Sequence, residues 1–126
     1  MSDLRTLDPR RAEAVENLCE LIVPGSGRVG PVVYVDAVIT QMPPPVRDLA
    51  LAAIDKLAHA ADEGAEALEA HVFTPEFGMI RALAIEAYYS DFVEPGRGVP
   101  GAWTDIGFDP PAARRLRKDW SWLGIA

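Results

Sequence analysis

The chain has 126 residues, of which 49% are hydrophobic, and a formal net charge of −7 at pH 7. This length predicts one domain, residues 1–126, and the hydrophobic fraction is sufficient for a folded core. The acidic charge argues against nucleic acid or an anionic membrane as the main partner, because both attract cationic surfaces. No apolar run in the sequence approaches the length of a membrane span.

The compartment is predicted from the cysteine content and the first residues. One cysteine, Cys19, cannot form an internal disulfide, so nothing requires an oxidising compartment. The twin arginines at 10–11 are followed by charged Glu13 and Glu16, where an export signal needs an apolar segment. We therefore expect a cytoplasmic protein.

Taken in order, the chain predicts an all-α fold, a small irregular bundle of about five helices. Prolines mark the first helical positions, where a missing backbone N–H is tolerated. Apolar residues at helical spacing then predict helices over residues 9–23, 46–61, 75–89 and 112–119, with a short helical turn over 65–70.

Residues 31–42 are ambiguous between a strand and a helix. Their β-branched residues suit a strand. Pro31 at the start and the spacing of Val35, Val38 and Ile39 instead favour a helix of about 11 residues. We interpret the segment as a helix.

The sequence shows no set of residues with the spacing of a metal site or a catalytic triad. His59 and His71 are twelve residues apart and have no Cys or His partner at metal-ligand spacing. Cys19 lies on an apolar helix stripe, which favours a buried structural side chain over a nucleophile. The Gly-x-Gly-x-x-Gly of residues 25–30 follows a helix, whereas a dinucleotide-binding loop follows a strand, so we interpret it as a helix–helix loop.

Aromatic and turn-forming residues gather in residues 86–108, which hold five of the ten aromatic residues. Rings belong in cores or interfaces, because each can bury ~150–250 Å², and Pro and Gly fix unusual backbone conformations. We therefore expect an ordered loop, 92–109, that faces a partner together with the tail, 120–126. The predicted partner-binding residues are Tyr89, Phe92, Trp103, Phe108, Arg114, Arg117, Trp120 and Trp122.

The loop also contains residues that we expect to fix its shape: Asp91, Asp105, Gly101 and Gly107. A carboxylate in such a loop can accept backbone N–H groups. The cations of residues 114–118 form either a solvated face paired with the chain's own acids or a docking stripe for an acidic partner. The tail either tucks into a groove of its own domain or reaches a partner.

Two stretches of this sequence resemble the gluconate 2-dehydrogenase small-subunit (gamma, or subunit 3) family. The first combines residues 87–91 (AYYSD) with residues 101–108 (GAWTDIGF), and the second is residues 18–24 (LCELIVP). The resemblance implies a small subunit that accompanies a flavin-dependent sugar or alcohol dehydrogenase of the glucose–methanol–choline type and helps it fold. It also implies that FAD belongs to the partner subunit, and that this chain carries no cofactor and no catalytic residue.

The sequence departs from that family in two respects. It lacks the export signal that the family often carries, and residues 95–101 (PGRGVPG) replace a Gly-Gly-Asn that is common in the family's loop. We therefore expect a cytoplasmic version with a cytoplasmic partner oxidoreductase. Two alternatives remain open: a small enzyme that acts on a carbohydrate-like ligand through Asp91 or Asp105 with His71, and a homodimeric structural domain.

Overall fold

The structure is a computed structural model that describes residues 3–108 and 120–125. These residues form an all-α bundle without a strand, as predicted. The helices are α1 (Pro9–Ile22), α2 (Pro31–Gln41), α3 (Pro44–Glu63), α4 (Ala65–Glu69), α5 (Pro75–Tyr89) and α6 (Ala102–Asp105), with short 3-10 turns η1 (Ser26–Val29) and η2 (Ser121–Leu123). None of the described helices is long and apolar enough to cross a membrane. The predicted helix over 112–119 lies outside the described residues.

Each of the four long helices has proline in its first turn, as the sequence predicts: Pro9, Pro31, Pro44 and Pro75. Side chains cap two of them. The Asp8 carboxylate accepts the backbone N–H of Arg11 at 2.8 Å, and the Thr74 hydroxyl accepts that of Phe77 at 3.3 Å. These caps satisfy N–H groups that have no partner inside the helix.

Two elements differ from the prediction. The third helix extends from Pro44 to Glu63 rather than over 46–61, because it already begins within the run of three prolines. The predicted irregular loop over 92–109 contains one helical turn, Ala102–Asp105. An element of four residues is too short to show a helical period in its sequence.

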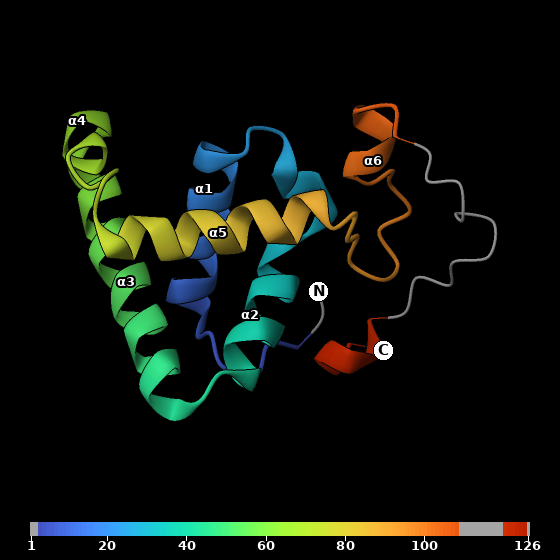
Figure 1. The fold of residues 1–126 in the computed structure, drawn as a ribbon, viewed down its shortest axis with the longest axis horizontal. Helices are drawn as coiled ribbons and strands as arrows, with labels where there is room; N and C mark the ends of the chain where they lie inside the picture. Colours follow the sequence, from blue (N-terminus) through green and yellow to red (C-terminus); the bar gives the residue numbers. More distant parts are fainter. Residues whose placement is uncertain (1–2, 109–119, 126) are drawn as a thin grey trace.

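The other elements enclose α2. Residues 31–37 are all buried, and α1, α3, α5 and η2 pack against this helix. Figure 1 shows α5 crossing in front of α1, with α2 and α3 on either side of α1. A helix that is buried on every side has no polar stripe, which explains why its sequence also suits a strand. The helical interpretation of this segment is confirmed.

A buried carboxylate on α2 holds the N-terminal segment. Asp36 is 2% exposed, and its oxygens accept the backbone N–H groups of three consecutive residues: Arg5 at 2.9 Å, Thr6 at 2.9 Å and Leu7 at 2.8 Å. The Thr6 and Thr40 hydroxyls add a hydrogen bond of 2.7 Å. The segment before α1 is thereby fixed to α2, with Leu7 buried in the core.

We expect Asp36→Ala to lower the free energy of unfolding by about 2–4 kcal/mol, because it leaves one buried and two partly buried N–H groups without their acceptor. Asp36→Asn keeps one acceptor oxygen and should lose less. The exposed residue Asp48 on α3 is the matched control. Its replacement by Ala should change the free energy by no more than about 0.5 kcal/mol. Equal stability of the two alanine variants in urea unfolding would contradict this role of Asp36.

Candidate functional site

Asp91 closes the loop that follows α5. Its backbone φ is 64°, a left-handed conformation that costs a residue with a side chain about 1 kcal/mol. Its buried carboxylate accepts the backbone N–H of Trp103 at 3.0 Å. Gly101 lies against this carboxylate, and a Cβ on it would lie only 2.2 Å from Asp91 Oδ1. The two ends of the loop therefore meet at Asp91.

Glu94, near the start of the loop, attaches the loop to η1. Its backbone N–H donates to the Val29 carbonyl at 2.8 Å, and its buried carboxylate accepts Nε–H of Arg97 at 2.8 Å. Gly30 lies beneath it with a φ of 72°, and a Cβ there would lie 2.5 Å from Glu94 Oε1. Glu94 is not predicted from the sequence, because a carboxylate near an arginine in a polar loop usually signals a solvated pair.

Arg28 and Tyr88 fasten α6 to the rest of the domain. The Arg28 guanidinium donates to the Tyr88 hydroxyl at 2.8 Å and forms an ion pair with Asp105 on α6. The Tyr88 hydroxyl donates to the same carboxylate. The hydrogen bonds from Tyr88 and Arg28 lower the pKa of Asp105 below the ordinary aspartate value, and the bond from Tyr88 has the larger effect. Asp105 thus holds the loop through the side chains of Arg28 and Tyr88 and not through the backbone N–H groups predicted from the sequence.

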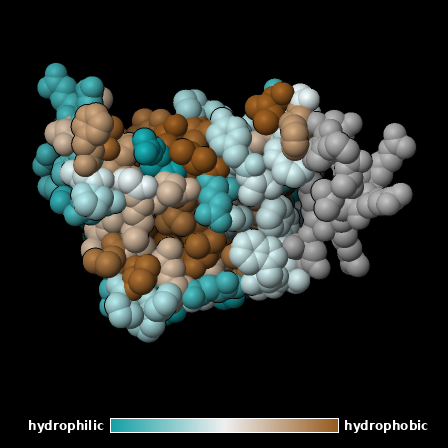
Figure 2. All heavy atoms as spheres, viewed as in Figure 1, coloured by the Kyte–Doolittle hydropathy of each residue, from teal (hydrophilic) through white to brown (hydrophobic). Residues whose placement is uncertain are grey.

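Four large side chains remain accessible on this fixed frame, and we call them the α6 surface: Tyr89, Trp103, Ile106 and Phe108. Tyr89 is 46% exposed, Ile106 59% and Phe108 51%, while Trp103 is partly buried. The Trp103 ring meets Phe108 edge-on at 5.3 Å, and its indole N–H donates to the Tyr89 carbonyl at 3.0 Å. Figure 2 shows hydrophobic side chains over α6 at the upper right. The structure therefore brings together three of the predicted partner-binding residues.

The sequence predicts a partner-facing role for Phe92 and Trp120, but the structure places both against the core. Phe92 is 0% exposed and Trp120 is partly buried. The Phe92 ring meets the rings of Tyr34 and Trp120 edge-on, at 5.3 Å in each case. The physical reason is that α2 needs apolar cover on a side that no long helix reaches.

The described part of the tail tucks onto its own domain, and Trp122 lies apart from the α6 surface. Gln41 at the end of α2 donates to the Trp122 carbonyl at 2.6 Å, and Arg5 donates to the Leu123 carbonyl at 2.7 Å. Figure 1 shows η2 and α6 well separated. The Trp122 ring itself is exposed.

The remaining predicted residues are Gly107, Arg114 and Arg117, and the sequence also predicts a structural role for Cys19. Gly107 has a φ of 68°, so it turns the chain directly before Phe108. Arg114 and Arg117 lie outside the described residues. Burial raises the pKa of the Cys19 thiol to about 12, which agrees with a structural side chain rather than a thiolate nucleophile.

The structure does not assemble the acid–base group that the enzyme alternative requires. That alternative combines His71 with Asp91 or Asp105, yet His71 precedes α5 and Asp91 follows it. The 15 residues of α5 separate them by about 22 Å. Among residues 3–108 and 120–125, no group of three or more His, Cys, Asp and Glu side chains is placed to hold a metal ion.

A methyl group at Gly101 tests the closure of the loop. We expect Gly101→Ala to lower the free energy of unfolding by about 1–3 kcal/mol, because its Cβ would overlap the Asp91 carboxylate. Gly78 on α5 is the matched control, since no atom lies within 4 Å of a Cβ there. Gly78→Ala should stabilise the helix by about 0.5–1 kcal/mol. Changes of the same sign and size in thermal unfolding would contradict the proposed role of Gly101.

The contribution of the Asp105 carboxylate to the stability of the fold depends on pH. Because its pKa is lowered in the folded state, it stabilises the fold above the ordinary aspartate pKa and ceases to do so as the pH falls through the lowered value. The stability difference between wild type and Asp105→Asn should therefore be constant near neutral pH and shrink below about pH 4. In a Tyr88→Phe background this pH-dependent difference should be smaller. A difference that is unchanged down to about pH 3 would contradict this prediction.

Comparison of the chain with protein-family models, with curated proteins and with solved structures found no match. The resemblance of residues 87–91 and 101–108 to the gluconate 2-dehydrogenase small subunit remains a hypothesis that rests on those motifs. In the structure these two segments are in contact, because the Trp103 backbone N–H donates to the Asp91 carboxylate.

Proposed function

We propose that this chain is an accessory subunit that binds a flavin-dependent sugar or alcohol oxidoreductase and stabilises it or helps it fold. The contact includes the α6 surface, and FAD belongs to the partner subunit. The cytoplasm is the proposed compartment of the complex. The observation that carries the proposal is a cluster of exposed rings on a loop that three separate sets of contacts hold in place.

The fixed shape of the loop favours recognition over a role as a linker. A flexible loop loses conformational entropy when a partner orders it, at a cost of about 0.5–1.5 kcal/mol for each immobilised side chain. The Trp103 ring is already held by Phe108 and by the Tyr89 carbonyl. Much of that ordering cost is therefore met when the domain folds, and burying the rings adds directly to binding.

The position of the family-like motifs also supports the proposal. Residues 89–91, Trp103 and residues 106–108 are the ones on which the resemblance rests. The same residues build the α6 surface and its closure at Asp91. Aromatic side chains are common anchors in protein interfaces, so a motif of this kind fits contact with a large subunit better than a general packing role.

Co-expression with candidate flavin-dependent oxidoreductases, beginning with any that a neighbouring gene encodes, tests the proposal. We expect the two chains to co-elute in size-exclusion chromatography, and the yield of soluble, FAD-loaded flavoprotein to fall when this chain is omitted. The double variant Ile106→Ser, Phe108→Ser should weaken binding by about 10–100-fold, because it removes two exposed anchors. The matched control is Leu49→Ser, which changes an exposed leucine on α3. Figure 1 shows α3 and α6 on opposite sides of the molecule.

Two results would overturn the proposal. One is a flavoprotein that is soluble, fully flavinated and active without this chain and does not co-elute with it. The other is an isolated chain that sediments as a dimer and becomes monomeric in the double variant. In that case the α6 surface joins two copies of this chain, as the homodimer alternative predicts.

A further inference from the structure

We propose a second docking site on the same partner: the groove between α1, α4 and the first half of α5 receives an amphipathic helix of the oxidoreductase subunit. This inference rests on the proposed function. The helix would place aliphatic side chains in the groove and an acidic side chain opposite Arg81. This helix would be a part of the partner's surface that does not touch the α6 surface.

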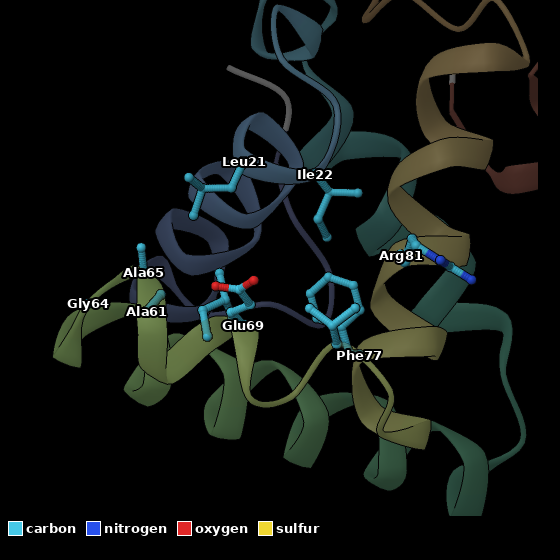
Figure 3. Close-up of a pocket in the computed structure, with 10 residues that line it drawn as sticks. Leu21, Ile22, Ala61, Gly64, Ala65, Glu69, Phe77 and Arg81 are labelled. Carbon is cyan, nitrogen blue, oxygen red and sulfur yellow. The ribbon is translucent and has the colours of Figure 1, made fainter.

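The groove is apolar and large enough for several side chains. It has a volume of about 480 Å³, and its lining includes Leu21, Ile22, Leu68, Val72, Phe77 and Arg81. Figure 3 shows Leu21 and Ile22 of α1 on one side and Phe77 of α5 on the other. Leu21 is 59% exposed, and Phe73, directly after the lining residue Val72, is 100% exposed. Large apolar side chains in water beside an apolar hollow are typical of an interaction surface.

Charge distinguishes this groove from a general apolar surface. Glu69 of α4 and Arg81 of α5 both line it, and in the view of Figure 3 they lie on either side of Phe77. In the part of the chain that the structure describes, no ion pair or hydrogen bond engages Arg81. An unpaired cation on an acidic protein is complementary to a carboxylate on a partner.

The exposure of these residues favours a helix over a small molecule. The Arg81 side chain extends from α5 away from Phe77 (Figure 3), and both Arg81 and Leu21 are exposed. A small molecule sunk into the groove would leave both in water. A helix lying across the groove covers Leu21 with its apolar face and reaches Arg81 with an acidic residue at its edge, which is the usual mode of helix-in-groove recognition.

A ridge on α5 connects the groove with the α6 surface. Arg81, Ile85 and Tyr89 follow one another at steps of four residues, the spacing of neighbours along one ridge of a helix. Ile85 and Tyr89 are both exposed. Arg81 and Tyr89 are eight positions apart, which is about 12 Å along the helix, so one partner can contact both ends of this ridge. Figure 1 shows α4 and α6 at opposite ends of α5.

The area required by a stable complex supports the same conclusion. A standard interface buries roughly 800 Å² on each partner. A half-exposed aromatic side chain such as Tyr89 or Phe108 offers roughly 100 Å², so the α6 surface, with Ile106 and the accessible part of Trp103, offers less than the area of a standard interface by itself. The groove, with Leu21, Phe73 and Ile85, provides further apolar area on a contiguous face.

Photo-cross-linking in the complex tests the inference. A benzophenone amino acid is placed at position 21 for the groove, at position 108 for the α6 surface and at position 49 as a control on α3, each in the full chain co-expressed with the flavoprotein. We expect positions 21 and 108 to cross-link to the flavoprotein and position 49 not to do so. Mass spectrometry should map the product of position 21 to a helix that carries an acidic residue.

A charge reversal supplies the matched binding measurement. Arg81→Glu should weaken the complex by about tenfold, because it places like charges together, whereas Arg81→Lys should weaken it less. Arg10→Glu is the control, since Arg10 is an exposed arginine on α1 and its reversal changes the net charge equally. Circular dichroism of each variant establishes that it is folded.

The outcomes separate this inference from the proposed function. Cross-linking from position 108 without cross-linking from position 21, or equal binding by Arg81→Glu and Arg10→Glu, overturns the groove site and leaves the proposed function intact. Cross-linking of position 21 to a second copy of this chain also overturns the groove site. No cross-linking to the flavoprotein from any position, together with a lack of co-elution, overturns both.

Discussion

The burial of α2 on all sides is the constraint on which the rest of the structure depends. Its first seven residues, 31–37, are enclosed, and α1, α3 and α5 cover only part of its circumference. The remaining cover comes from the short 3-10 turns and from the loop and tail. Tyr34 shows how they meet, because its ring touches Phe92 of the loop and Trp120 of the tail. Its hydroxyl donates to Glu86 on α5 at 2.7 Å. Loop, tail and helix bundle thus share one core.

This constraint also explains why the α6 surface has a defined position. Phe92 is fully buried, so the loop has an anchor in the core at its start, and Glu94 and Asp91 fix it at two further points. Each point depends on a glycine that lets the chain approach a carboxylate closely, Gly30 under Glu94 and Gly101 against Asp91. These contacts hold the loop that carries α6 at several points.

The helices could be predicted because their signals are local, whereas the site depends on contacts distant in sequence. Proline and a capping residue mark the beginning of α5 within a few positions, at Thr74–Pro75. By contrast, Arg28 and Asp105 are 77 residues apart, and no local pattern pairs them. The same limit applies to the rings. Composition identifies aromatic residues, but only the packing around α2 decides that Phe92 is buried and Phe108 exposed. The groove likewise arises only when α1, α4 and α5 come together.

The two proposed contacts lie on a single rigid helix, and this arrangement affects how strongly they act together. Phe77 and Arg81 line the groove near the start of α5, and Tyr89 ends the helix beside α6. Once a partner engages one site, the other is held at a fixed distance, so the second contact forms at a high effective concentration. Two sites that are each too small for a stable interface can therefore give one, provided that the partner's matching surfaces have the same spacing. This requirement selects for a partner with a complementary rigid face and disfavours proteins that match only one of the two sites.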